Sequence, residues 1–121
     1  MAEKFMAALR NSDQIDITVT GRATGRQITV PVWFVEAEGN LYLVPVRGSD
    51  SDWYKNVRAT PHMQLTADGE SIAVTAAPIT NPDRVRAIIG KFREKYGADQ
   101  IASYYPKTDA AVEVSLPTEA S

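Results

Sequence analysis

The feature that most constrains the fold of this chain is a series of short β-branched and aromatic runs separated by turn residues. Ile15, Ile17 and Val19 alternate with polar residues, which predicts a half-buried strand. Asp68-Gly69 stands between two further alternating runs and indicates a β-hairpin. Strands are expected at 15–19, 27–35, 41–46, 62–67, 71–77 and 111–116.

Helical patterns surround these strands and show no alternating βαβ order. Asn81, Pro82 and Gly97 mark the start and end of the clearest helix. Other helices are expected at 2–10, 50–59 and 98–105, and the tail 117–121 is expected to fray. The sequence therefore predicts one domain over 1–121, mainly β or α+β: a small, partly open barrel of about six mostly antiparallel strands with flanking helices.

Pro31 and Pro45 fall inside two strand runs that are expected to pair. Proline cannot donate to a ladder, so each marks an edge, a bulge or an interruption. Two such positions on neighbouring strands predict that the sheet opens locally.

Composition excludes several classes of protein. A formal charge of -2 argues against general binding to nucleic acid. The chain has no cysteine and a single histidine, His62, so neither a thiolate nucleophile nor a multi-histidine metal site is expected. No signal peptide and no apolar run long enough to span a bilayer is seen, which makes a cytoplasmic protein the default expectation.

Cationic and aromatic residues gather around the opening. Arg22 and Arg26 flank a glycine turn that also holds Thr24, and Arg47 follows the third strand run. Guanidinium groups beside glycine backbone suit a phosphate or carboxylate, although they can equally be solvated loop charges. On the expected helix, Trp53 and Val57 are spaced to face inward. Because Trp53 and Tyr54 are adjacent, one is expected to pack in the barrel and the other to line a cleft.

Asn56, in the middle of that helix, is expected to hydrogen-bond a loop or a ligand. Tyr104 is a candidate aromatic lid or proton donor, or simply packs. Apolar walls, interrupted strands and anion-binding side chains together suit a planar redox cofactor with a phosphate tail.

Two motifs carry a family resemblance. T-G-R-A-T-G at 20–25, followed by Pro31, and W-Y-K-N-V-R-A-T-P at 53–61 resemble the deazaflavin-dependent nitroreductase and quinone reductase family. That family belongs to the flavin/deazaflavin oxidoreductases of the FMN-binding split β-barrel type. The resemblance covers about residues 16–116.

The resemblance implies a split β-barrel that binds the deazaflavin coenzyme F420, with FMN as the alternative. The phosphate would be held by Arg22, Thr24, Gly25, Arg26 and the strand residues Pro31, Val32 and Trp33. The ring would lie along Val44, Pro45, Val46, Arg47 and Gly48, and the site would be closed by Trp53, Tyr54 and Asn56. Tyr104 would lie near the substrate. The family usually has a lysine at Ala23 and an arginine at Ile28, and Arg26, two residues before Ile28, is expected to substitute for that arginine.

The resulting hypothesis is an oxidoreductase that transfers a hydride to a small electron-poor acceptor such as a quinone or nitro compound. The alternatives are a cofactor-binding barrel without turnover and a regulatory nucleotide-binding barrel. A homodimer is also expected, since such barrels are frequently dimeric in the wider family. No metal site is expected.

Overall fold

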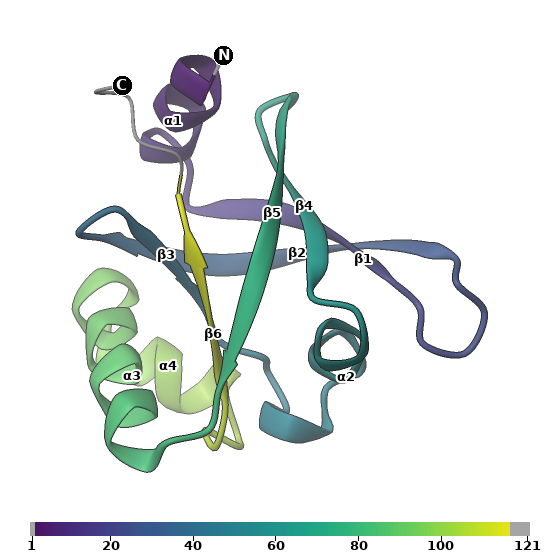
Figure 1. Cartoon of the computed structure of the whole chain (residues 1–121). Coiled ribbons are helices and arrows are strands. Elements are labelled where there is room, and N and C mark those ends of the chain that lie inside the picture. The colour runs from purple at the N-terminus through teal and green to yellow at the C-terminus, as the bar shows by residue number, and fades with distance from the viewer. Residues whose placement is uncertain (1, 117–121) are drawn as a thin grey trace.

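Figure 1 shows the chain as a computed structural model, which describes residues 2–116. The predicted frayed tail lies outside these residues. The strands are β1 (Gln14–Thr20), β2 (Gln27–Ala37), β3 (Asn40–Leu43), β4 (His62–Ala67), β5 (Glu70–Ile79) and β6 (Ala111–Ser115). The helices are α1 (Ala2–Arg10), the 3-10 helix η1 (Gly48–Asp50), α2 (Asp52–Ala59), α3 (Pro82–Tyr96) and α4 (Ala98–Tyr104).

The six strands form a closed ring in the order β1-β2-β3-β6-β5-β4. Every neighbouring pair in this ring is antiparallel, which confirms the predicted mainly β, split-barrel class. The ring of strands is closed, whereas a partly open barrel was predicted. Closure depends on β3 pairing with β6, where Leu43 lies opposite Val112.

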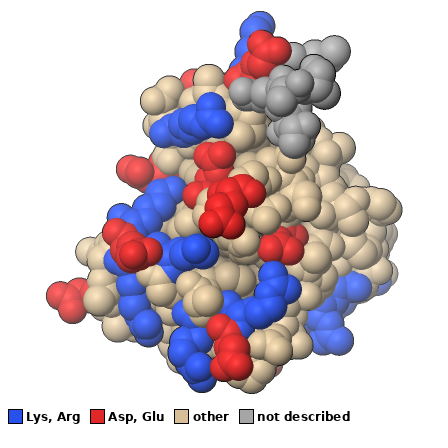
Figure 2. All heavy atoms as spheres, turned by 60° about the vertical axis from the view of Figure 1, so that its left-hand side comes forward, with Lys and Arg blue, Asp and Glu red and all other residues tan. Residues whose placement is uncertain are grey.

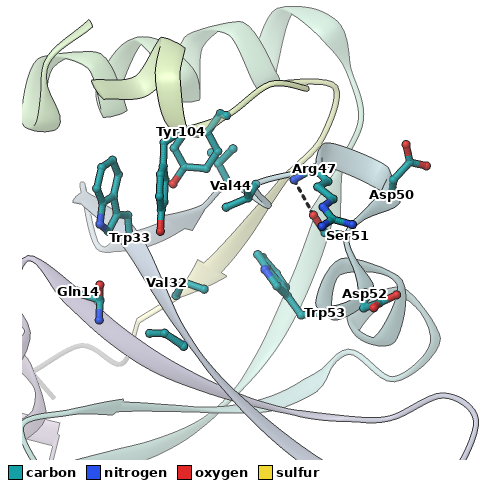
Figure 3. A pocket seen from close by; sticks show the side chains of 13 residues that line it. Gln14, Val32, Trp33, Val44, Arg47, Asp50, Ser51, Asp52, Trp53 and Tyr104 are labelled. Atoms are coloured by element: carbon teal, nitrogen blue, oxygen red, sulfur yellow. Dashed lines mark hydrogen bonds between the residues drawn. The ribbon is translucent and has the colours of Figure 1, made fainter. Parts of the chain in front are cut away.

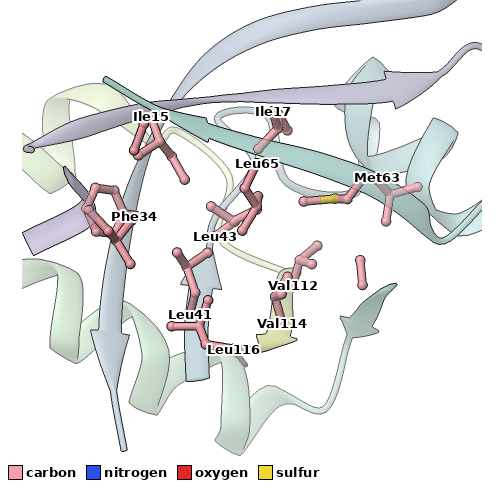
Figure 4. Close-up of a cluster of buried hydrophobic side chains, with 14 of the residues drawn as sticks. Ile15, Ile17, Phe34, Leu41, Leu43, Met63, Leu65, Val112, Val114 and Leu116 are labelled. Carbon is pink, nitrogen blue, oxygen red and sulfur yellow. The ribbon is translucent and has the colours of Figure 1, made fainter. Parts of the chain in front are cut away.

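The barrel interior is filled by the inward residues of all six strands (Figure 4). Ile15, Ile17 and Val19 are at most 2% exposed, as their alternation predicts. At one end of the barrel α1 adds Phe5, Met6 and Leu9 to this core. At the other end α2 adds Tyr54 and Val57. Figure 1 shows these two helices at the top and bottom of the view.

A second apolar cluster lies outside the barrel, where α3 and α4 pack on the sheet. The Asn81 side chain accepts a hydrogen bond from the Arg84 amide at 3.1 Å, and Gly97 ends α3 with φ 96°. Both predicted boundaries of this helix are confirmed. Figure 2 shows basic and acidic side chains interspersed on this face of the molecule.

The region after β3 differs from the expected strand at 41–46. Ladder pairing of β3 stops at Leu43, so Val44, Pro45 and Val46 lie outside the sheet. The helix predicted from residue 50 is divided into η1 and α2. Ser51 stands at the junction, and its hydroxyl accepts a hydrogen bond from the Arg47 amide at 2.8 Å instead of capping α2.

Pro31 has the edge position that its chemistry predicts. Residues 27–33 of β2 pair with β1, whereas pairing with β3 begins only at Phe34. At Pro31 the strand therefore has a partner on one side only. The two prolines mark the place where β2 and β3 separate, and the predicted local opening of the sheet is confirmed.

Within residues 2–116, no helix is long and apolar enough to cross a membrane.

Candidate functional site

A cavity of about 330 Å³ lies where β2 and β3 separate (Figure 3). We call it the main cavity because it is more enclosed than three larger cavities of the described chain. β2 lines it with Pro31, Val32 and Trp33, and the segment that leaves β3 lines it with Val44 and Val46. α4 stands on one side, and η1 with the start of α2 on the other. This size is within the range of small-molecule sites.

Aromatic rings form two walls of the main cavity. The Trp33 ring is stacked between Tyr96 and Tyr104, with centroid distances of 4.4 Å and 4.5 Å. Because protein covers both faces of Trp33, Tyr104 is the member of this stack that can offer a ring face to a ligand, and it is 48% exposed. Trp53 projects from α2 toward the cavity from the other side (Figure 3).

Three charged side chains line the main cavity, and two of them form ion pairs with other residues. The Asp50 carboxylate accepts a hydrogen bond from Lys107 at 2.9 Å, which holds its pKa below the ordinary value. Asp52 pairs with Arg22 at 3.5 Å. The Arg47 guanidinium forms no ion pair with any residue of the described chain. Arg47 is therefore the cationic group left to meet an anionic ligand.

Asp109 holds the η1 segment in place from the loop before β6. Its carboxylate accepts hydrogen bonds from the Ser49 amide at 2.8 Å and the Ser49 hydroxyl at 2.6 Å. Partial burial opposes ionisation of Asp109, but these bonds and the charge of Lys107 outweigh it and lower the pKa. Gly48, with φ 57°, lies so close that an added Cβ would collide with the Asp109 carboxylate.

The glycine turn after β1 is docked on α2 and does not face the main cavity. Arg22 donates to Asn56 Oδ1 from its amide at 3.1 Å and from its guanidinium at 2.7 Å. Asn56 is 4% exposed and its predicted hydrogen bond to a loop is present. A second cavity, of about 350 Å³ and more open to solvent, lies at this contact and is lined by Arg22, Thr24 and Asn56 among others.

The structure thus separates the predicted site residues into three groups. Those that line the main cavity are Pro31, Val32, Trp33, Val44, Val46, Arg47, Trp53 and Tyr104. The second group lines the cavity at the glycine turn and consists of Arg22, Thr24 and Asn56. The third group lines neither cavity and consists of Gly25, Arg26, Pro45, Gly48 and Tyr54. Tyr54 is fully buried in the barrel core and cannot close the cavity, whereas Trp53, predicted to face inward, lines it. The binding roles of these residues stay predictions.

Sequence reasoning missed Gln14, which lines the cavity, and Asp109 and Lys107, which hold its rim. Asp109 meets Ser49 across 60 positions of the chain, and only closure of the barrel brings them together. No local pattern in the sequence could have indicated that contact. Among residues 2–116 no group of acidic or histidine side chains is placed to hold a metal ion.

Fold and cavity together define a split β-barrel protein with an aromatic-walled cavity at the split. A family model described as "Uncharacterized protein conserved in bacteria (DUF2255)" matches residues 6–115. The chain belongs to this family.

Solved structures of low sequence identity share the fold. An F420-H2-dependent reductase, FDR-A, is 22% identical over 84% of this chain and 93% of its own, with a TM-score of 0.65. HutZ, the heme storage protein from Vibrio cholerae, is 11% identical over 98% and 90%, with a TM-score of 0.70. A putative 5-nitroimidazole antibiotic resistance protein from Bacteroides thetaiotaomicron is 12% identical over 98% and 81%, with a TM-score of 0.72. At these identities the similarity establishes the fold alone.

Proposed function

We propose that the main cavity binds a planar, phosphate-bearing redox cofactor, the deazaflavin F420 or FMN, and that the protein is an oxidoreductase. The observation that carries this proposal is that two aromatic walls, Trp53 and Tyr104, and the cation Arg47, which has no ion pair among the described residues, line one cavity. A flat ring system with an anionic tail has complementary chemistry.

The backbone of the cavity also fits such a ring. In the described chain, neither a carbonyl nor a side chain accepts a hydrogen bond from the Val46 amide. Val46 lines the cavity, and its amide would meet a polar edge of the ring. Pro31 and Val32 offer an apolar floor. The Val46 amide and this apolar floor both support the proposal.

The residues of the cavity would bind and orient. When bound, the cofactor would supply the hydride for a small electron-poor acceptor such as a quinone or nitro compound. Trp53 and Tyr104 would hold and orient the ring, and Arg47 would fix the phosphate by charge-assisted hydrogen bonds. The exposed side of Tyr104 leaves an approach for an acceptor.

The names of the solved structures with this fold point to two kinds of ligand, a deazaflavin and heme. FDR-A is an F420-H2-dependent reductase, and the Bacteroides protein is described by resistance to 5-nitroimidazole, a nitro compound. Both descriptions agree with the proposed chemistry, whereas HutZ is a heme storage protein. In this chain His62 lines a different cavity, with Met63 and Val74, so the main cavity offers no histidine to a heme iron. This observation favours a flavin-like ring over heme.

Arg47→Ala tests the assignment of the phosphate. Loss of a charge-assisted contact should weaken FMN binding by on the order of 10–100-fold. Riboflavin has the same ring without the phosphate, and its affinity should hardly change. Fluorescence titration of both ligands against wild type and variant measures this. Arg26, which the sequence predicted to hold the phosphate, lines neither cavity, so Arg26→Ala is the matched control and should leave both affinities unchanged.

Equal loss of FMN and riboflavin affinity in Arg47→Ala would show that Arg47 does not bind the phosphate. Turnover is measured separately, as oxidation of reduced F420 or FMN in the presence of a simple quinone. Binding without turnover would make the protein a cofactor carrier.

A further inference from the structure

We infer that Arg22 is a positioning residue: it docks the β1–β2 turn on α2 and thereby orients Trp53 in the main cavity, and does not itself bind the ligand. The part that concerns ligand affinity rests on the proposed function. The part that concerns the placement of Trp53 does not.

The turn that carries Arg22 is itself well ordered by hydrogen bonds. The Gly21 amide donates to the Arg26 carbonyl at 2.7 Å, and the Gly25 amide donates to the Gly21 carbonyl at 2.8 Å. Gly25 has φ 75°, a conformation that favours glycine. The two glycines of the T-G-R-A-T-G motif therefore build a turn that fixes where Arg22 begins.

From this turn the Arg22 side chain reaches one face of α2. Its guanidinium donates to the Asp52 carbonyl at 3.3 Å and to Asn56 Oδ1 at 2.7 Å, and it pairs with the Asp52 carboxylate at 3.5 Å. Asp52 and Asn56 are four residues apart, so they lie one above the other on the helix. The contacts join the first turn of α2 to its middle.

Trp53 follows Asp52 directly in this first turn. Asp52 lines both the main cavity and the second cavity at the Arg22 contact, so the two cavities adjoin at this residue. η1, which precedes α2, is held by Asp109. Without Arg22 the start of α2 would lose its attachment on the other side, and the Trp53 ring would gain freedom to turn.

The same contacts argue against Arg22 as a phosphate ligand. Its guanidinium already serves three acceptors on α2, and Arg22 does not line the main cavity. An anion at Arg22 would have to displace Asp52 or Asn56 Oδ1. Asn56 is buried, and loss of the guanidinium would leave its Oδ1 with the weaker bond from the Arg22 amide at 3.1 Å.

The first test uses the ligand-free protein. In a Trp33→Phe background Trp53 is the single tryptophan, and acrylamide quenching reports how exposed its ring is. Arg22→Ala should raise the quenching constant about twofold, because the start of α2 loosens. Arg22→Lys should give an intermediate value, since lysine keeps the charge but cannot serve all three acceptors. Arg26→Ala, in the same turn, should not change it.

All variants are compared well below the unfolding transition measured by circular dichroism, so that a change in folded fraction does not contribute. If Arg22→Ala fails to fold, Arg22→Lys against Arg26→Ala decides the question. Quenching in Arg22→Ala or Arg22→Lys equal to that in Arg26→Ala would overturn the inference.

The second test compares FMN with riboflavin. A positioning residue acts on the ring site, so Arg22→Ala should weaken both ligands equally, by about tenfold. Selective loss of FMN affinity would instead make Arg22 a phosphate ligand and overturn the inference. If neither ligand binds wild type, the proposed function fails, and the quenching result alone decides the role of Arg22.

Discussion

At the scale of single residues, Tyr54 buries a hydroxyl group without a compensating hydrogen bond from the described residues. Its ring is fully buried in the barrel core, and its hydroxyl has no hydrogen-bond partner among the described residues. Burial raises the pKa of this phenol, which keeps it neutral. A buried hydroxyl without a partner opposes folding by its desolvation.

Tyr54→Phe should leave the free energy of unfolding unchanged or raise it by up to about 1 kcal/mol, because only the unpaired hydroxyl is removed. Tyr96→Phe is the matched control. The Tyr96 hydroxyl lies 2.8 Å from both the Phe34 and Asp13 carbonyls and accepts from the Phe34 amide, so its removal should cost about 1–2 kcal/mol. Urea unfolding of both variants measures the difference. Equal destabilisation would show that the Tyr54 hydroxyl has a partner.

At the scale of elements, the rim of the main cavity depends on contacts between segments far apart in the chain. Asp109 and Lys107 precede β6, yet they hold Ser49 and Asp50 of η1. The close approach of Gly48 to Asp109 lets the two segments meet. The shape of the cavity therefore depends on ionised carboxylates.

This contact predicts how stability changes with pH. The pKa of Asp109 is lowered in the folded state, so its contribution is full above the unfolded value near 4 and is lost as pH falls through the folded value. Asp109→Asn should lower the free energy of unfolding by about 1 kcal/mol at pH 7. The difference from wild type should stay constant down to about pH 5 and shrink toward pH 3. Urea unfolding at pH 7, 5 and 3 tests it, and a pH-independent difference would contradict the assigned role.

At the scale of the whole molecule, local sequence patterns predicted the helices and strands but not the contacts between distant segments. The alternation at Ile15, Ile17 and Val19 and the capping signal at Asn81 act over a few residues, so the sequence alone was sufficient for them. Pro31 and Pro45 located the opening because proline has the same consequence in any sheet. Even so, the end of β3 was placed three residues too late, since Leu43 is the last residue to find a partner on β6.

The site was predicted less completely for the same reason. Arg47, Trp53 and Tyr104 were identified and line the main cavity. Arg22 was assigned to a phosphate, because nothing near it in the sequence indicates that Asp52 and Asn56 occupy its guanidinium. Contacts across 30 or more positions follow from barrel closure and cannot be read from composition or spacing. The homodimer also stays a prediction.

The central claim is that the main cavity binds a planar redox cofactor between Trp53 and Tyr104. The most direct measurement is an absorption and fluorescence titration of purified protein with F420 and with FMN, for wild type and for a Trp53→Ala/Tyr104→Ala variant. We predict that wild type binds at least one of the two with micromolar affinity and that the variant loses this binding by on the order of 100-fold. Failure of wild type to bind either cofactor, or equal binding by the variant, would contradict the claim.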